Sequence, residues 1–243
     1  MKTDQPLRIL AIDIGGTGVK AALVDGAGLL LEGPCRCPTP RQASPQQVLD
    51  AILQLVQTLG EFDSISIGFP GAIKHNIIYT APNLATELWH GVNFTALVEA
   101  RFNRPTRLAN DATMHGLGII EGEGIEVILT LGTGMGFALF RDGIPAPQIE
   151  LGRHPAGEEP TYDDFVGDGA LRRLGEPAWK ERVLKTIGRL VSLVNFDVLY
   201  LGGGNARLFR IEELPNSVKI ARNEAGLVGG ARLWRQGLGD YCK

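Results

Sequence analysis

Short apolar runs rich in β-branched residues recur along this chain, and each ends in a cluster of turn-forming residues. Such runs predict β-strands, and the first three follow one another without an intervening helix, which indicates an antiparallel start. A further apolar segment at 73–79 predicts a small hairpin. The predicted strands are 7–12, 19–24, 29–31, 64–69, 106–109, 125–131, 137–140, 197–201 and 218–220.

Between these strands, apolar residues spaced three and four apart predict amphipathic helices. One begins at Pro45, where Ser44 is a suitable N-cap and proline is favoured at the first helical position. The segments 34–45 and 145–161 carry no such pattern, and we expect them to be loops. The other predicted helices are 94–102, 111–120, 179–196 and 225–235, with a short one after 202–204.

The chain also resembles itself at an offset of 117 residues, which aligns Gly15 with Gly132 and Asp25 with Asp142. Both segments read as strand, glycine-rich turn, strand and Asp-Gly turn. Any two such hairpins share these features, but one repeat at half the chain length favours two similar α/β domains. We place them at 1–110 and 111–243, with the final helix able to pack back on the first domain. Ligands often bind between such domains.

Composition narrows the classes of function. A formal net charge of -3 and the lack of a basic stretch argue against nucleic-acid binding. No apolar run approaches a membrane span, and the first residues do not resemble a secretion signal, so we expect a cytoplasmic protein without a membrane partner. The three cysteines Cys35, Cys37 and Cys242 are too few for a disulfide framework. Cys35 and Cys37 resemble half of a metal site that lacks a second half, and we expect these two to be free thiols in a loop.

Glycine is abundant, at 32 of 243 residues, and three clusters follow apolar strands directly. Glycines at such places allow backbone N–H groups to face a phosphate, although each cluster alone could be an ordinary turn. The first is neither a Walker A loop nor a Rossmann fingerprint, since no Gly-Lys-Ser/Thr or helix follows it. Together they suggest a nucleotide or another polyphosphate as ligand. The clusters are Gly15-Gly16-Thr17-Gly18, Gly132-Thr133-Gly134-Met135-Gly136 and Gly202-Gly203-Gly204.

Polar residues near strand ends are candidates for chemistry. Asp13 could hold Mg²⁺ through water. Asn110 and Asp111 lie between a strand and a helix; one of them serves as a helix N-cap, which leaves the other available as a base for a substrate hydroxyl. Asn83 and the stretch from Glu150 to His154 could bind a polar ligand or lie in solvated loops.

Taken in order, these motifs resemble the ROK family (repressor, open reading frame, kinase) along nearly the whole chain, and most of all its short polyphosphate/ATP glucokinase branch. Because the first strand is expected near residue 7, we expect no helix-turn-helix before it, unlike in the repressors. The matching motifs are Asp13-Ile-Gly-Gly-Thr17, Phe69-Pro-Gly71, Pro82-Asn-Leu84, Asn110-Asp111, Leu131-Gly-Thr-Gly134, Glu150-Leu-Gly152 and Gly202-Gly-Gly204.

The resemblance implies an actin-like (ribonuclease H-like) fold in which two α/β domains close on a sugar, commonly as a homodimer. It implies a kinase in which Asp111 accepts the proton of the attacking hydroxyl, here the 6-hydroxyl of glucose, with ATP or polyphosphate as donor and Mg²⁺ as cofactor. The implied sugar contacts are Gly71, Asn83, Asn110, Asp111, Glu150 and His154. The implied phosphate or nucleotide contacts are Asp13, Gly15, Gly16, Thr17, Thr133, Gly134 and Gly203.

Two departures from the family pattern bear on function. No cysteine cluster follows the Glu150-Leu-Gly152 motif, since Cys242 near the C-terminal end is the single cysteine beyond it, so we expect no zinc site. The histidine position of the family is Arg153 here, with His154 one place later, so a kinase for mannose or an amino sugar, or a non-catalytic sugar sensor, stays open. The phosphoryl donor also stays open. Polyphosphate would prefer a basic groove. The candidates for such a groove are Arg172, Arg173, Lys180, Arg182 and Lys185, and Glu176 and Glu181 reduce the net positive charge of this segment.

Overall fold

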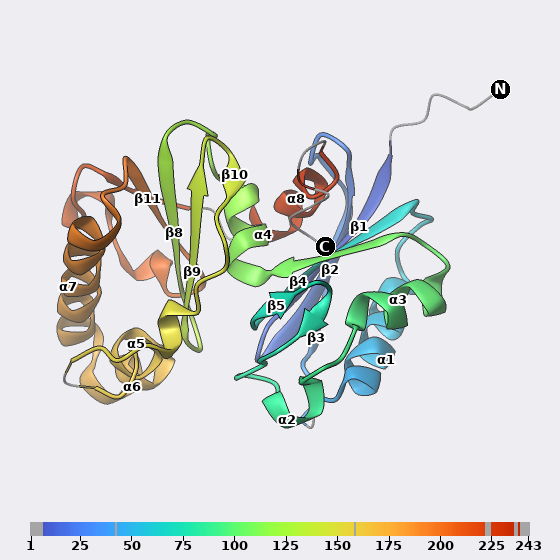
Figure 1. Cartoon of the computed structure of the whole chain (residues 1–243), viewed down its shortest axis with the longest axis horizontal. Coiled ribbons are helices and arrows are strands. Elements are labelled where there is room, and N and C mark those ends of the chain that lie inside the picture. The colour runs from blue at the N-terminus through green and yellow to red at the C-terminus, as the bar shows by residue number, and fades with distance from the viewer. Residues whose placement is uncertain (1–6, 42, 158, 222–224, 236–237, 239–243) are drawn as a thin grey trace. The chain divides into compact units, whose positions relative to one another are not determined.

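The computed structural model describes residues 7–41, 43–157, 159–221, 225–235 and 238. The chain divides into two compact units (Figure 1). The first comprises Met1–Gly118 and Glu224–Lys243, and the second comprises Ile119–Asn223.

The first unit contains a five-stranded sheet in the order β3-β2-β1-β4-β7. The pairs β1–β2 and β2–β3 are antiparallel, whereas β1–β4 and β4–β7 are parallel. All six residues of β4 are buried, as expected for a parallel strand inside a sheet. The strands are β1 (Arg8–Ile14), β2 (Gly18–Asp25), β3 (Leu30–Pro38), β4 (Ser64–Phe69) and β7 (Thr106–Asn110), and a separate hairpin pairs β5 (Ile73–Lys74) with β6 (Ile77–Ile78).

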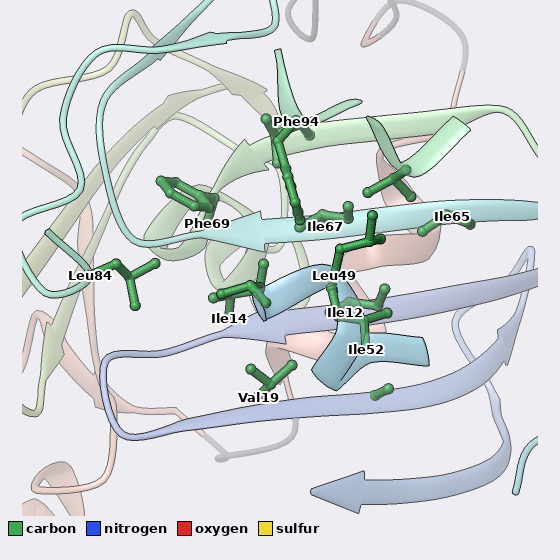
Figure 2. Packing of buried hydrophobic residues seen from close by; sticks show 14 of the residues in the cluster. Ile12, Ile14, Val19, Leu49, Ile52, Ile65, Ile67, Phe69, Leu84 and Phe94 are labelled. Carbon is green, nitrogen blue, oxygen red and sulfur yellow. The ribbon is translucent and has the colours of Figure 1, made fainter. Parts of the chain in front are cut away.

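Helices pack against this sheet. The first of them begins as predicted, because Ser44 and Gln47 form a reciprocal capping box and Pro45 follows the cap. Figure 2 shows how Ile52 of α1 and Phe94 of α3 pack with Ile12 of β1 and Ile67 of β4 in one apolar core. The helices of this unit are α1 (Pro45–Val56), α2 (Thr86–Trp89), α3 (Phe94–Phe102), α4 (Asp111–Leu117) and α8 (Ala225–Arg232).

The C-terminal helix α8 belongs to the first unit and packs against α4 and β1. Close approach of α4 and α8 depends on glycine: a Cβ at Gly118 would overlap the carbonyl of Ala225, and one at Gly229 would overlap that of Met114. The division therefore lies after Gly118 and not after residue 110, since α4 packs on elements of the first unit.

Strand β3 runs farther than the sequence suggested. It continues through Pro38, where a loop was expected, with Cys35 paired to Ala21 and Cys37 to Val19. The prolines are tolerated because β3 lies at the edge of the sheet, where proline does not break a ladder of hydrogen bonds on both sides. Cys35 and Cys37 are free thiols that pack against the core; Cys242 lies outside the described residues.

The second unit contains another five-stranded sheet, in the order β10-β9-β8-β11-β12. The pairs β8–β9 and β9–β10 are antiparallel, and β8–β11 and β11–β12 are parallel. This repeats the order and directions of the first sheet, so the internal repeat of the sequence has a counterpart in the strand topology. The strands are β8 (Ile125–Leu131), β9 (Met135–Arg141), β10 (Ile144–Pro145), β11 (Val198–Gly202) and β12 (Val218–Ile220).

Helix α7 covers the core of this unit through Trp179, Val183 and Ile187, which are buried. Two short helices, α5 and α6, were not predicted, because five and seven residues are too few to display a helical period. The short helix expected after Gly202–Gly204 is a single 3-10 turn. The helical segments are η1 (Leu151–Arg153), α5 (Tyr162–Val166), α6 (Asp168–Leu174), α7 (Glu176–Val194), η2 (Ala206–Leu208) and η3 (Ile211–Glu213).

Membrane crossing can be tested on the helices that the structure describes. None of them combines the length and the apolar character that a membrane span requires.

Candidate active site

The turn between β1 and β2 contains the first glycine cluster. Gly15 N–H donates to Gly18 O at 2.9 Å, and Thr39 Oγ1 donates to Gly15 O at 2.6 Å. Gly16 lies against Asn83, since a Cβ on Gly16 would lie 3.0 Å from the Cβ of Asn83. The structure thus brings a candidate phosphate turn beside a candidate sugar contact within the first unit.

Asp13 lies near the end of β1, two residues before Gly15, and is the candidate contact for Mg²⁺. Burial raises the pKa of its carboxyl, and the Lys20 ammonium, 3.7 Å from Oδ2, partly offsets that effect. Mg²⁺ is usually held by one or two carboxylates together with waters and substrate phosphates, so a single Asp13 fits that role. Among the described residues no three His, Cys, Asp or Glu side chains gather as a metal cage, and the expected absence of zinc stays a prediction.

His115 of α4 lies beside the same groups. A Cβ on Gly226 would lie 3.6 Å from His115 Nδ1 and 4.0 Å from Asp13 Cγ, so both side chains lie next to Gly226 of α8. Burial, and secondarily repulsion from Lys20, lowers the pKa of His115 to about 4. Its buried Nε2 makes no hydrogen bond within the described chain. The sequence analysis did not single out His115.

Asn110 and Asp111 divide two tasks at the end of β7. Asn110 is the buried N-cap of α4, and its Oδ1 accepts the N–H groups of Ala112 and Thr113 at 3.0 and 3.3 Å. Its Nδ2 donates to Gly71 O at 3.3 Å, which ties the turn after β4 to the start of α4. Asp111 therefore stands in the first helical turn without being the cap, and its Oδ1 accepts the N–H of Ala112 at 2.8 Å.

The position of Gly71 in the loop after β4 has no room for a side chain. A Cβ there would overlap the carbonyl of Thr80, and the Thr80 hydroxyl accepts the N–H of Ala72 at 2.9 Å. The first unit thus gathers Gly71, Asn110 and Asp111 at the ends of β4 and β7, which are parallel neighbours. Polar groups at the carboxyl ends of parallel strands are a common arrangement for a ligand site.

In the second unit the other two glycine clusters meet. Gly132 N–H donates to Gly134 O at 3.0 Å in the β8–β9 turn, where Thr133 is exposed. Gly203, with φ +82°, lies so close to the backbone of Leu131 that a Cβ would overlap it. The predicted contacts Thr133, Gly134 and Gly203 are therefore neighbours across β8 and β11.

Glu150 lies beside this turn in a cluster of charges. Burial raises the pKa of Glu150, the Asp163 carboxylate raises it further, and Gln148 and Arg153 act in the opposite direction. Asp163 Oδ1 accepts the N–H of Met135 at 2.7 Å, and Arg153 Nη1 lies 3.7 Å from its Oδ2. Burial raises the pKa of Asp163 as well.

Arg153 and His154 are both exposed at the end of η1, and Arg153 is the one that pairs with Asp163 beside Glu150. Sequence reasoning missed Asp163, whose only signal was a pair of acids opening a short helix. Glu150 and His154 belong to the second unit, whereas Asn83, Asn110 and Asp111 belong to the first.

The basic residues considered for polyphosphate are largely paired. Glu159 binds both Arg173 and Arg182, at 2.6 and 2.8 Å, and Lys180 binds Glu176 and Glu213, at 3.0 and 3.2 Å. These pairs tie α6, α7 and η3 to neighbouring segments and account for three of the five basic residues. Their charge is balanced in place by acids of the same unit.

The glycine turns, the Asn-Asp pair and the duplicated sheets agree with a comparison to known families, in which the model described as ROK family matches residues 9–148. The chain belongs to the ROK family.

Individual relatives of this ROK protein are named as sugar kinases. It is 27% identical over 237 residues to the polyphosphate glucokinase of Mycobacterium tuberculosis, which covers 90% of this chain and 88% of the relative. It also superposes on the inorganic polyphosphate/ATP-glucomannokinase of Arthrobacter sp. strain KM with a TM-score of 0.83 at 29% identity, over 93% of this chain and 97% of the other.

A glucokinase of Streptomyces griseus, crystallised with glucose and AMPPNP, shares the fold at a TM-score of 0.78 and 20% identity, over 95% of this chain and all of the other, 100%. These enzymes have the actin-like ATPase fold, so the predicted fold of this ROK protein is confirmed. The roles of its individual site residues stay predictions.

Proposed function

We propose that this ROK protein is a sugar kinase that transfers a phosphoryl group from ATP or polyphosphate to the 6-hydroxyl of glucose. The observation that carries the proposal is the division of labour between Asn110 and Asp111. Asn110 caps α4 and donates to Gly71 O, and Asp111 directly follows it at the carboxyl ends of the parallel strands β4 and β7, where a carboxylate can meet a substrate hydroxyl. The names of the relatives, glucokinase and glucomannokinase among them, support the same activity.

In this mechanism the Asp111 carboxylate accepts the proton of the sugar hydroxyl as its oxygen forms a bond to the terminal phosphorus. The bond from that phosphorus to the bridging oxygen breaks, and the shortened donor leaves with the electron pair. Phosphoryl transfer asks the protein mainly for positioning and charge stabilisation. Asp13 would hold Mg²⁺ through water, and the ion would neutralise charge on the donor phosphates. The backbone of Gly15, Gly16 and Thr17, and that of Thr133, Gly134 and Gly203, would bind phosphate or nucleotide.

The sugar itself would be oriented by polar groups that differ in character. Asn83 and Asn110 can donate and accept, and Gly71 offers its backbone. Glu150 is a strong acceptor when ionised, and His154 is exposed beside η1. A homodimer in the cytoplasm is expected from the family resemblance and stays a prediction.

A second acceptor sugar is favoured by one observation, the ion pair between Arg153 and Asp163 beside Glu150. A guanidinium presents several N–H donors in a rigid plane, so the hydrogen bonds that it can offer to sugar hydroxyls differ in number and geometry from those of an imidazole. Mannose or an amino sugar is therefore the alternative substrate. Comparing kcat/KM for glucose, mannose and glucosamine in the wild type and in Arg153→His tests it, and an unchanged preference in the variant would dismiss Arg153 as a determinant.

The decisive test is a coupled assay for glucose 6-phosphate, with ATP and polyphosphate supplied separately in the presence of Mg²⁺. Asp111→Asn should lower kcat by about 10²-fold to 10⁴-fold, the range that general-base catalysis contributes. Asp50→Asn is the matched control, because Asp50 is an exposed acid on α1 that accepts a hydrogen bond from Gln46. Near-normal turnover in a folded Asp111→Asn variant would remove Asp111 from the mechanism, and binding of glucose without turnover in the wild type would favour the sensor.

A further inference from the structure

The glycine turn between β8 and β9 is held from one side by the start of α6. Asp168 N–H donates to Gly132 O at 2.9 Å. Gly167 packs against the same turn, since a Cβ there would lie 2.7 Å from Thr133 O and 3.3 Å from Gly134 Cα. The residue Asp168 is thus fixed next to the turn that would contact the phosphates of the donor.

The carboxylate of Asp168 is fixed as well. Asn205 Nδ2 donates to Asp168 Oδ1 at 2.5 Å, and Asn205 N–H donates to Leu131 O at 3.0 Å. Asn205 directly follows the Gly202–Gly204 cluster at the end of β11. The Asp168–Asn205 pair therefore bridges the two glycine clusters of the second unit, and the half-buried carboxylate stays at this point.

A fixed negative charge here acts differently on the two donor classes. A polyphosphate chain carries negative charge along its whole length, so a phosphate that extends past the turn toward Asp168 is repelled. A nucleoside triphosphate carries its charge on three phosphates and continues as a neutral nucleoside. Hydroxyl groups of a ribose are good donors to a carboxylate, as in dinucleotide-binding folds.

In the second unit as a whole, acidic residues outnumber basic ones. Residues 119–223 contain 12 Lys and Arg against 15 Asp and Glu, a formal net charge of -3. Arg173, Lys180 and Arg182 already pair with acids. A groove for a long polyanion requires unbalanced basic residues, and within the described residues these three do not supply them.

We propose that Asp168, held by Asn205, restricts the phosphoryl donor to a nucleoside triphosphate and disfavours polyphosphate. The inference rests on the proposed kinase function. It assigns Asp168 as a determinant of donor specificity, with Asn205 as the residue that positions it.

The test compares kcat/KM for ATP and for polyphosphate of defined chain length, at saturating glucose and Mg²⁺, in the full chain. The wild type should prefer ATP, with a kcat/KM for ATP at least about tenfold above that for polyphosphate. Asp168→Asn should lower this ratio of ATP to polyphosphate by about tenfold or more, as expected for removal of one nearby charge. Glu212→Gln is the control, since Glu212 is an exposed acid of the same unit and its loss changes the net charge equally. The ratio should be unchanged in that variant.

The proposal would be overturned by a wild type with equal kcat/KM for polyphosphate and ATP. An Asp168→Asn variant with an unchanged ratio of ATP to polyphosphate would also overturn it. So would an Asp168→Asn variant whose main defect is a raised requirement for Mg²⁺. The last would make Asp168 a metal contact. Calorimetric binding of AMPPNP and of polyphosphate separates this inference from the proposed function. A protein without turnover that still binds AMPPNP in preference, with the preference lost in Asp168→Asn, would contradict the kinase and support Asp168; equal binding of both donors would contradict Asp168 directly.

Discussion

The side-chain amide of Asn110 donates to the backbone carbonyl of Gly71 at 3.3 Å, while its carbonyl oxygen caps α4. One side chain thus joins the loop after β4 to the helix that carries Asp111. Asn93 caps α3 in the same manner, accepting the N–H of Ala96 at 2.9 Å, but it has no such second bond among the described residues. The two asparagines allow a comparison between a cap next to Asp111, the proposed catalytic base, and a cap that is not next to any candidate site residue in sequence.

Replacing either asparagine by alanine should lower the free energy of unfolding by about 0.5–2 kcal/mol, the usual value of an N-cap. Asn110→Ala should cost more than Asn93→Ala, because it also leaves a buried carbonyl of Gly71 without this donor. Only Asn110→Ala should lower kcat strongly, since Asp111 loses its support. Urea denaturation and the coupled assay measure the two effects, and equal activity of the two variants would contradict the positioning role.

The ion pair between Lys20 and Asp13 predicts a pH effect on activity. Lys20 lowers the pKa of Asp13 against the raising effect of burial, so Lys20→Met should raise that pKa further. If binding of the donor with Mg²⁺ requires ionised Asp13, activity is present above this pKa and is lost as the pH falls through it. The acid limb of the pH profile of kcat/KM for the donor should therefore move to higher pH in the variant.

Lys74→Met is the control for this experiment, since Lys74 is an exposed lysine on β5 of the same unit. Its acid limb should coincide with that of the wild type. An acid limb that does not move in Lys20→Met would mean that Asp13 does not govern donor binding.

His115 predicts how stability depends on pH. Its folded-state pKa is lowered to about 4, below the ordinary value of about 6.5, so the unfolded chain binds a proton between these values and the folded chain does not. Stability contributed by neutral His115 is complete above pH 6.5 and is lost as the pH falls toward 4, by as much as about 3 kcal/mol.

His115→Leu removes this titration and also removes a buried nitrogen that has no hydrogen-bond partner among the residues that the structure describes. The difference in free energy of unfolding between variant and wild type should therefore shift in favour of the variant as the pH is lowered from 7 to 4. Urea denaturation at several pH values measures it, and parallel curves for the two proteins would rule out a buried neutral His115.

Two glycines inside helices predict opposite effects of one substitution. Gly188 lies within α7, and no described residue outside the backbone of that helix lies within 4 Å of the position of a Cβ, so Gly188→Ala should stabilise the protein by about 0.5–1 kcal/mol through helix propensity. Gly229 lies within α8, where a Cβ would overlap the backbone carbonyl of Met114. Gly229→Ala should therefore destabilise by about 1–3 kcal/mol, as overpacking does.

Thermal and urea denaturation measure both variants. A Gly229→Ala protein as stable as the wild type would contradict the close packing of α4 against α8. A Gly188→Ala protein that loses stability would indicate that this part of α7 is covered by something other than solvent.

Local physics explains why most elements could be read from the sequence. Ser44 and Pro45 specify where α1 begins, because a cap and a proline act within one turn. The strands around the two glycine-rich turns, β1 with β2 and β8 with β9, are specified by β-branched residues and by turn preferences, and both hairpins form as expected. The candidate phosphate turns and the Asn110-Asp111 pair were found for the same reason: each is a contiguous motif at the end of a strand.

The sequence by itself determined the ROK motifs, the two hairpins and the main helices, because these depend on residues that are neighbours along the chain. The tertiary structure decided everything that depends on partners far apart in sequence. Only folding extends β3 along β2, pairs Glu159 with Arg173 and Arg182, and sets Asp163 beside Glu150 and Arg153. It also brings Asp168 to Asn205, 37 positions later in the chain. The charge balance and the burial of these side chains depend on residues that approach each other only when the chain packs. A contiguous sequence motif does not specify which distant side chain will neutralise a given charge.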